Sequence, residues 1–179
     1  MKVLVRVELG ADLKRKLHIV RPADMGRGVV KPGRLPMTLS IILANKGRDV
    51  VAIEPNASLA EAVRLLAEKR IGAALILGAD RRLAGIISER DIVRSLAERG
   101  AAVLDEPVSR TMTRKVESCS ESDTVSHIME RMTAGKFRHM PVVDQGQVVG
   151  LVSIGDIVKH RLREMEREST AMRDYIMTA

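Results

Sequence analysis

Apolar and polar positions follow a regular order from residue 38 onward. Apolar runs of strand length alternate with stretches in which apolar side chains recur at the 3.6-residue spacing of an amphipathic helix. Ser58, with Glu61 three residues later, is typical of a helix start. The predicted elements are a short helix at 40–45, a strand at 50–53, a helix from Ser58, a strand at 71–77, a return strand at 83–87 and a helix after Ser88.

The second half of the chain repeats this order with an offset of 66 residues before the hairpin and 65 after it. Its predicted elements are a short helix at 108–112, a strand at 116–120, a helix capped by Thr124, strands at 137–143 and 148–152, and a helix after Ser153. A repeat of this length indicates duplicated units that bury their sheets against each other. We therefore expect an α/β (α+β) fold of two strand-helix-strand-strand-helix repeats related by a pseudo-two-fold axis.

The clearest part of the repeat is a strand-to-helix junction. Residues 85–93 and 150–158 share the pattern Gly-h-h-Ser-x-x-Asp, where h is apolar. A helix start presents unpaired N–H groups that suit an anion, and an Asp one turn inside the helix could accept hydrogen bonds from two sugar hydroxyls. A nucleotide would satisfy both groups. The alternative is that each motif is a capping box only, worth about 1 kcal/mol.

Composition narrows the function. The net charge of the 179-residue chain is +7, but residues 1–36 hold nine basic side chains against three acidic ones, and the remainder is nearly neutral. Only Phe137 and Tyr175 are aromatic, so stacking platforms for nucleic acid are lacking and we expect no nucleic-acid partner.

The single cysteine excludes an internal disulfide, and four scattered histidines argue against a structural zinc or other metal site. We expect no membrane span, no signal peptide and a cytoplasmic location.

Four segments are expected along the chain. Residues 1–36, rich in Pro, Gly and basic residues, are predicted to be a flexible extension, which raises the hypothesis that translation starts at Met37. Residues 37–100 and 101–162 are the predicted repeats. Residues 163–179 are charged and helix-prone and are expected to pack on a neighbour.

The duplicated Gly-h-h-Ser-x-x-Asp motif, the strand Arg138-His139-Met140-Pro141-Val142-Val143 and the linker Thr111-Met112-Thr113 resemble a tandem pair of CBS (cystathionine β-synthase-type) domains, the Bateman module, over residues 38–162. The closest likeness within the family is to small stand-alone CBS-pair proteins. The resemblance implies a flat homodimer, a regulated protein partner whose identity the sequence does not give, and a sensing function without catalysis. It implies ligands that contain adenosine: AMP, ADP, ATP, NAD(H) or S-adenosylmethionine, none of them a catalytic cofactor.

The resemblance also implies roles for individual residues. Asp91 and Asp156 match the aspartate that binds ribose, and Ser88 and Ser153 match the hydroxyl that helps to hold phosphate or ribose. The basic pair that faces the phosphates is matched by Arg138 and His139. Positions that surround the adenine are matched by Ala52, Ile53, Ser118, Cys119, Met140 and Pro141.

The first repeat departs from this pattern because Gly72-Ala73-Ala74 replaces Arg-His-Met. We therefore expect two unequal clefts. Asp91 is predicted to act with Arg138 and His139, whereas the cleft of Asp156, left with Lys69 and Arg70, is predicted to bind weakly or not at all.

Two other function classes remain open. The chain could be a structural or protein-interaction homodimer whose Ser-x-x-Asp boxes only cap helices, with His139 an ordinary strand residue and Arg138 a solvated one. An enzyme is the least favoured class because the sequence offers no nucleophile-base pair, metal cluster or Walker-type loop.

Overall fold

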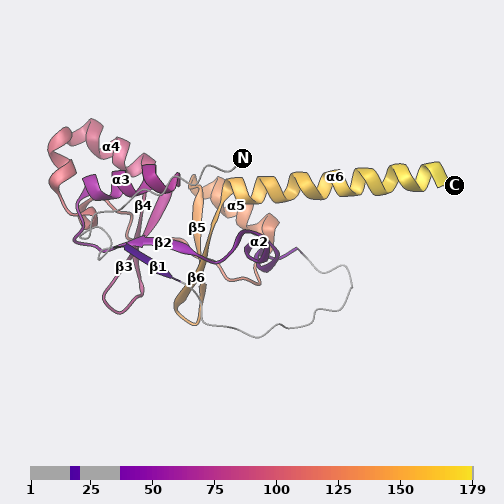
Figure 1. Ribbon diagram of the computed structural model, residues 1–179, viewed down its shortest axis with the longest axis horizontal. Coiled ribbons are helices and arrows are strands. Elements are labelled where there is room, and N and C mark those ends of the chain that lie inside the picture. Colours follow the sequence, from indigo (N-terminus) through magenta and orange to yellow (C-terminus); the bar gives the residue numbers. More distant parts are fainter. Residues whose placement is uncertain (1–16, 21–36, 179) are drawn as a thin grey trace.

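The structure is a computed structural model that describes residues 17–20 and 37–178 of the chain. The predictions for residues 1–16 and 21–36, which include most of the predicted extension, lie outside the described residues. The elements in chain order are β1 (Leu17–Val20), α2 (Leu39–Lys46), β2 (Val50–Ile53), α3 (Leu59–Lys69), β3 (Ala73–Leu77), β4 (Leu83–Ser88), α4 (Glu89–Arg99), the 3₁₀ helices η1 (Ala101–Asp105) and η2 (Val108–Arg110), α5 (Val125–Gly135), β5 (His139–Asp144), β6 (Gln147–Ser153) and α6 (Ile154–Thr178). Figure 1 shows the two halves of the chain side by side, with α6 extending away from them.

The first half is an open sheet with helices on one side. β2 pairs with β3 in parallel, and β3 pairs with β4 antiparallel through the predicted turn. The apolar faces of α3 and α4 pack on this sheet and form a buried cluster that includes Leu65, Ile76 and Ile87. β1 extends the sheet by antiparallel pairing with β2, so these four residues are ordered within a segment predicted to be flexible throughout.

The second half repeats the plan with a smaller sheet, made of β5 and β6. Two predictions are wrong here. The strand expected at 116–120 is reduced to one bridge, in which Cys119 N–H donates to Pro141 O and Val143 N–H donates to Cys119 O. The neighbouring Glu117 and Ser118 are exposed and contact Arg131 of α5 instead of pairing with β5. The helix expected at 108–112 is only the short η2.

The segments that precede the two repeats are exchanged between them. α2 was assigned to the first repeat, but Leu39, Ile42 and Leu43 are buried in the cluster of the second repeat. Its backbone is tied there as well, since Leu39 N–H donates to Asp123 O at 3.0 Å. Conversely, η1 and η2 bury side chains in the first cluster. The predicted boundary at residue 37 therefore differs from the structure, in which residues 39–43 pack with the second half.

The glycine that opens each repeated motif marks the place where the exchanged segment passes close to the sheet. A Cβ atom on Gly85 would lie 2.6 Å from Met112 Sδ and 3.0 Å from Thr113 O. A Cβ atom on Gly150 would lie 2.8 Å from Leu43 Cδ2. The duplicated glycine is thus explained by close packing rather than by ligand contact.

The two halves are held together by a third apolar cluster. Val50, Leu75 and Leu77 of the first half pack with Val148 of β6. The sheets therefore bury their faces against each other, as the repeat predicts. No helix among the described residues is long and apolar enough to cross a membrane.

Candidate functional site

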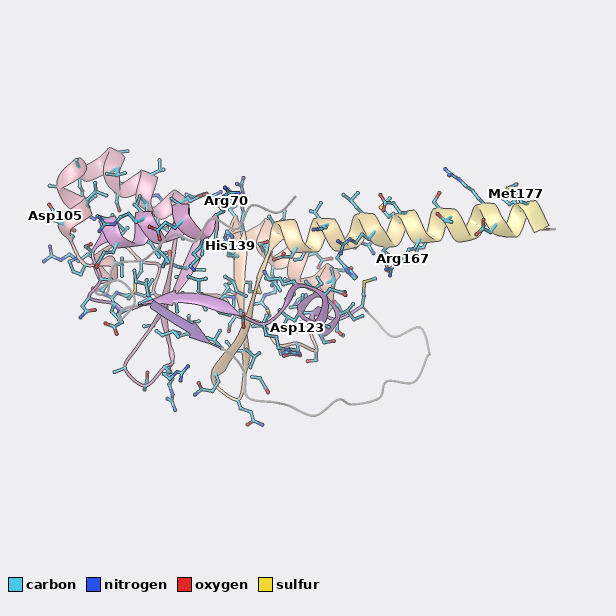
Figure 2. The ribbon with its side chains drawn as sticks, in the orientation of Figure 1. Arg70, Asp105, Asp123, His139, Arg167 and Met177 are labelled. Carbon is cyan, nitrogen blue, oxygen red and sulfur yellow. The ribbon has the colours of Figure 1, made fainter. Side chains whose placement is uncertain are left out.

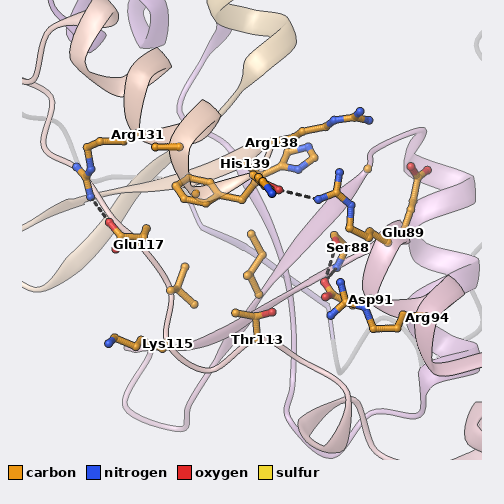
Figure 3. Close-up of a pocket in the computed structure, with 18 residues that line it drawn as sticks. Ser88, Glu89, Asp91, Arg94, Thr113, Lys115, Glu117, Arg131, Arg138 and His139 are labelled. Carbon is orange, nitrogen blue, oxygen red and sulfur yellow. Dashed lines mark hydrogen bonds and ion pairs between the residues drawn. The ribbon is translucent and has the colours of Figure 1, made fainter. Parts of the chain in front are cut away.

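A cleft of about 810 Å³ lies between the two halves. It is bounded by the first turn of α4, the segment after η2, the end of α5 and the start of β5 (Figure 3). Its lining residues are Gly72, Ile86, Ser88, Glu89, Arg90, Asp91, Arg94, Thr113, Lys115, Val116, Glu117, Arg131, Ala134, Gly135, Lys136, Phe137, Arg138 and His139. Asp91 of the first repeat and the basic pair of the second thus line one cleft, the combination that the family resemblance implies.

Asp91 is fixed at the start of α4 by Ser88. The Oδ2 atom of Asp91 accepts hydrogen bonds from Ser88 N–H at 2.9 Å and from Ser88 Oγ at 2.5 Å. Both bonds use the same carboxylate oxygen. The capping interaction and a ligand interaction are therefore compatible, because Oδ1 can accept from a ligand hydroxyl while Oδ2 holds the helix start.

Asp156 stands at the equivalent position of the second repeat but has an additional partner. Its Oδ2 atom accepts from Ser153 N–H and Ser153 Oγ, both at 2.8 Å, and from Lys46 Nζ at 2.7 Å. Burial disfavours the charged carboxylate, but the hydrogen bonds from Lys46 and Ser153 outweigh this effect and lower the pKa of Asp156. Asp156 is therefore an ionised member of an ion pair, and neither Asp156 nor Ser153 lines the cleft.

His139 and Gly72 are packed against each other in the wall of the cleft. A Cβ atom on Gly72 would lie 3.2 Å from His139 Cε1, so the glycine that replaces Arg in the first repeat leaves room for this ring. Burial, together with the positive charge of Lys46, lowers the pKa of His139. At neutral pH the imidazole is uncharged, and Arg138, which is exposed, carries the charge of this pair.

The cleft has an excess of basic side chains. Figure 3 shows Arg94, Lys115, Arg131 and Arg138 around its rim. Six cationic residues line it against three acidic ones: Arg90, Arg94, Lys115, Arg131, Lys136 and Arg138 against Glu89, Asp91 and Glu117. An anion with several charges is the ligand that this arrangement favours electrostatically.

Two arginines are held in place by partners in the second half. Arg90 Nη1 donates to Lys136 O at 2.6 Å, which joins the first turn of α4 to the end of α5. Arg131 donates to Ser118 O at 2.9 Å and forms an ion pair with Glu117. The bond from Arg90 to Lys136 O links the two halves across the cleft. The width of the cleft therefore depends on the relative position of the two halves.

Apolar side chains form another part of the wall. Ile86, Val116 and Phe137 line the cleft. The ring of Phe137 lies against Gly135, where an added Cβ atom would come within 2.3 Å of Phe137 Cε1. A flat aromatic group could pack here, next to the carboxylate and cationic groups.

Several residues that the resemblance assigned to the adenine wall do not line this cleft. Ala52, Ile53, Cys119, Met140 and Pro141 are buried in the sheets, and Ser118 is exposed beside the cleft with its carbonyl bound to Arg131. Burial raises the pKa of the Cys119 thiol to about 12, so Cys119 is a side chain of the second core and not a reactive thiol. Lys69 and Arg70, assigned to the second cleft, are exposed at the end of α3.

Five of the six cationic lining residues were not singled out from the sequence. Arg90 and Arg94 lie four residues apart on α4, so their spacing is a signal that could have placed both on the helix face beside Asp91. Lys115 and Arg131 lie on segments far from the motif, and only the fold brings them to it. Within the described residues, no group of three or more His, Cys, Asp or Glu could hold a metal ion.

Comparison with known proteins shows the family and the fold. The family model of the CBS domain matches residues 46–98 and 108–163. A solved CBS-domain-containing protein of Agrobacterium tumefaciens is 41% identical and superposes with a TM-score of 0.70 over 74% of this chain and 99% of that one. The CBS domain pair of protein MJ0100, solved in complex with 5'-methylthioadenosine and S-adenosyl-L-methionine, is 27% identical with a TM-score of 0.65 over 72% of this chain and 98% of that one.

The curated relatives match this chain over a smaller share of their own length. An uncharacterized 17.7 kDa protein of Acidianus ambivalens is 33% identical over 111 residues, which are 62% of this chain and 66% of that protein. A CBS-domain-containing protein of Arabidopsis thaliana is 26% identical over 82% of this chain, but the match spans only 28% of the plant protein.

Proposed function

Because the chain belongs to the CBS-domain family, we propose that it is a non-catalytic regulatory module that binds one phosphorylated adenosine compound in the cleft between its repeats. The observation that carries the proposal is the meeting of Asp91 with Arg138 and a cationic rim in one cleft. The volume of about 810 Å³ is within the range of roughly 300–1,000 Å³ that is usual for small-molecule sites.

Each part of a nucleotide has a complementary surface in the cleft. Asp91 Oδ1 is suited to accept from the ribose hydroxyls, since Oδ2 is already bound to Ser88. The apolar wall that includes Phe137 is suited to the base. Arg138, with the basic side chains around it, is suited to the phosphates.

Charge selects among the adenosine ligands. S-adenosylmethionine carries a positive sulfonium, which the surplus of cationic side chains disfavours. AMP, ADP, ATP and NAD all carry phosphates that this surplus attracts. The complex of MJ0100 with S-adenosyl-L-methionine supports an adenosine site in this fold, and the charges favour a phosphorylated ligand in this chain.

We expect one ligand per chain. Asp156 already forms an ion pair with Lys46. The residue that corresponds to Lys46 in the other repeat is Met112, which has no charge and leaves Asp91 without such an ion pair among the described residues. A ribose at Asp156 would compete with the ammonium group, so this position is expected to stabilise the fold instead.

Binding would couple to the geometry of the whole module. The ligand would contact α4 of one half and β5 of the other, and the bond from Arg90 to Lys136 already connects α4 to the end of α5 in this second half. A nucleotide that prefers one relative position of the halves shifts the population toward it. We propose that a partner protein recognises this shifted arrangement.

The test is a thermal-shift series on protein stripped of ligand, with AMP, ADP, ATP, NAD, S-adenosylmethionine and adenosine. A ligand at 100 times its Kd adds about 2.7 kcal/mol, which for a chain of this size raises Tm by roughly 5–10 °C. The phosphorylated compounds should raise Tm, and S-adenosylmethionine should not. If none of the six changes Tm, the module is a structural or interaction unit whose serines only cap helices.

Matched variants identify the residues. Asp91→Asn should weaken the best nucleotide roughly 10- to 100-fold, because it removes a charged acceptor, whereas Asp156→Asn should leave its Kd within about twofold, within the usual scatter of single-site effects. Arg138→Gln should weaken ATP by about tenfold, as the loss of one charge-assisted contact would, while adenosine is unaffected. Equal effects of the two Asp variants, measured by calorimetry, would contradict the single-cleft assignment.

A further inference from the structure

The second half of α6 extends beyond the two repeats. The helix has 25 residues and is therefore about 37 Å long at 1.5 Å per residue. Its first turns bury Ile157 in the second repeat, whereas Figure 2 shows the part that includes Arg167 and Met177 away from the rest of the molecule. An isolated helix of this kind is stabilised mainly by burying an apolar face, and within the described residues this face has no partner.

Exposed apolar side chains form one stripe on α6. Val158, Leu162, Met165, Met172 and Ile176 are 46%, 55%, 60%, 61% and 68% exposed. Together with Ser169 they follow one another at alternating intervals of four and three residues. This is the spacing of a coiled-coil seam, with Leu162, Ser169 and Ile176 at positions a and Val158, Met165 and Met172 at positions d.

The charges beside this seam match a second copy of the same helix. In a parallel, in-register pair, each g residue lies next to the e residue five positions later on the other helix. Arg161 then faces Glu166 of the second copy, and Glu168 faces Arg173. Both contacts join opposite charges, and the two-fold symmetry forms each of them twice. Arg161 now donates to Glu164 of its own helix at 2.7 Å and can also reach Glu166 of a partner.

An antiparallel pair that overlaps along the whole stripe brings like charges together. Its e positions place Glu166 against Glu166 and Lys159 against Arg173, and its g positions place Glu168 against Glu168. A shift of one heptad removes these repulsions but leaves part of the stripe uncovered. We propose that α6 is a self-association surface, on which two copies of this chain pair through a parallel, in-register coiled coil of residues 158–176.

The pairing would act independently of nucleotide binding. The stripe begins after the residues that bury α6 in the second repeat, and none of its members lines the cleft. Parallel pairing would place two modules at the same end of the coiled coil. The two modules, each with its own cleft, would then lie next to each other in a fixed relative position.

Disulfide trapping tests the geometry. In the parallel register Ser169 meets Ser169 of the second copy, so Ser169→Cys, in a Cys119→Ala background, should form a covalent dimer under mild oxidation. Thr170→Cys, one residue further and outside the seam, is the matched control and should cross-link at least tenfold more slowly. Equal rates for the two variants would overturn the proposal. So would rapid cross-linking in a mixture of Met165→Cys and Ile176→Cys chains without cross-linking of Ser169→Cys, because that pattern belongs to the antiparallel pair shifted by one heptad.

Charge exchange is a second test that keeps the helix intact. Glu168→Arg places like charges beside Arg173 of the second copy and should reduce the Ser169→Cys cross-linking rate several-fold. The double change Glu168→Arg with Arg173→Glu restores opposite charges and should restore the rate. Failure of the double variant to recover the rate, with helix content unchanged by circular dichroism, would refute the charge pairing.

Discussion

At the scale of single residues, Asp91 and Asp156 show how one motif takes two chemical roles. Both accept hydrogen bonds from the serine that begins the helix. Only Asp156 also accepts from Lys46, a residue of α2. The difference arises outside the motif. α2 supplies Lys46 to the second repeat, whereas the segment after η2 supplies the uncharged Met112 to the first.

Lys46 acts electrostatically on two neighbours. It lowers the pKa of both Asp156 and His139, in addition to the effects of burial on each group. In the variant Lys46→Met the positive charge is lost, so the pKa values of the Asp156 carboxyl and the His139 imidazole should both rise, which NMR titration can follow. A fall in either value would contradict the assigned contacts.

The ion pair also links stability to pH. Because the pKa of Asp156 is lowered by folding, its stabilisation is present above the unfolded value, roughly 3.8–3.9, and is lost as the pH falls through the lower folded value. The parent should therefore be more stable than Lys46→Met near pH 7, by at most about 1 kcal/mol for a partly exposed pair. This difference should disappear in acid.

At the scale of elements, close backbone approach explains the glycine of the repeated motif. Ile86 N–H donates to Thr113 O at 3.0 Å and Thr113 N–H donates to Ile86 O at 2.9 Å, so β4 and the segment after η2 are held together beside Gly85. Thr113 lines the cleft. A side chain at residue 85 would therefore disturb both the packing and the site.

Two substitutions of Gly by Ala separate packing from helix propensity. Gly85→Ala should lower the free energy of unfolding by about 1–3 kcal/mol, because the methyl group overlaps Met112 and Thr113 O. Gly155→Ala, in the first turn of α6, meets nothing closer than Ser153 Oγ at 3.6 Å and should be neutral or add up to about 1 kcal/mol. Urea unfolding measures both. Equal destabilisation by the two variants would contradict the contact with the exchanged segment.

At the scale of the whole molecule, the exchange of α2 and η2 makes each half depend on the other. The second core contains Leu39, Ile42 and Leu43 from a segment that precedes the first repeat. The first core contains Val108 from the segment that precedes the second. The two repeats therefore share their cores, so each half needs a segment of the other to be complete.

The dependence can be measured with two variants of α2. Leu43 is fully buried and Ile41 is 43% exposed. Leu43→Ala should lower the free energy of unfolding by about 2–5 kcal/mol, whereas Ile41→Ala should change it by less than about 1 kcal/mol. Hydrogen exchange should show the greater loss of protection in β5 and β6, far along the chain from the substitution. Similar effects of the two substitutions would mean that α2 does not complete the second core.

The sequence by itself determined the elements and their duplication, because apolar periodicity and capping residues are local signals. β2, the cap of α3 by Ser58 and the start of α4 at Ser88 could all be predicted from neighbouring residues. The family resemblance added the expectation that Asp91 shares a cleft with Arg138 and His139. It also assigned Ala52 and Met140 to the adenine wall, whereas the structure buries both in the sheets.

Only the tertiary structure decided which segments complete each half and which charges meet. The bond between Lys46 and Asp156 joins residues 110 positions apart, and the cleft collects Lys115 and Arg131 from segments that no local pattern connects. The strand expected at 116–120 depends in the same way on pairing with β5, and only Cys119 makes that pairing. Contacts of this kind depend on how separate elements pack in space, and hydrophobic periodicity describes only one element at a time.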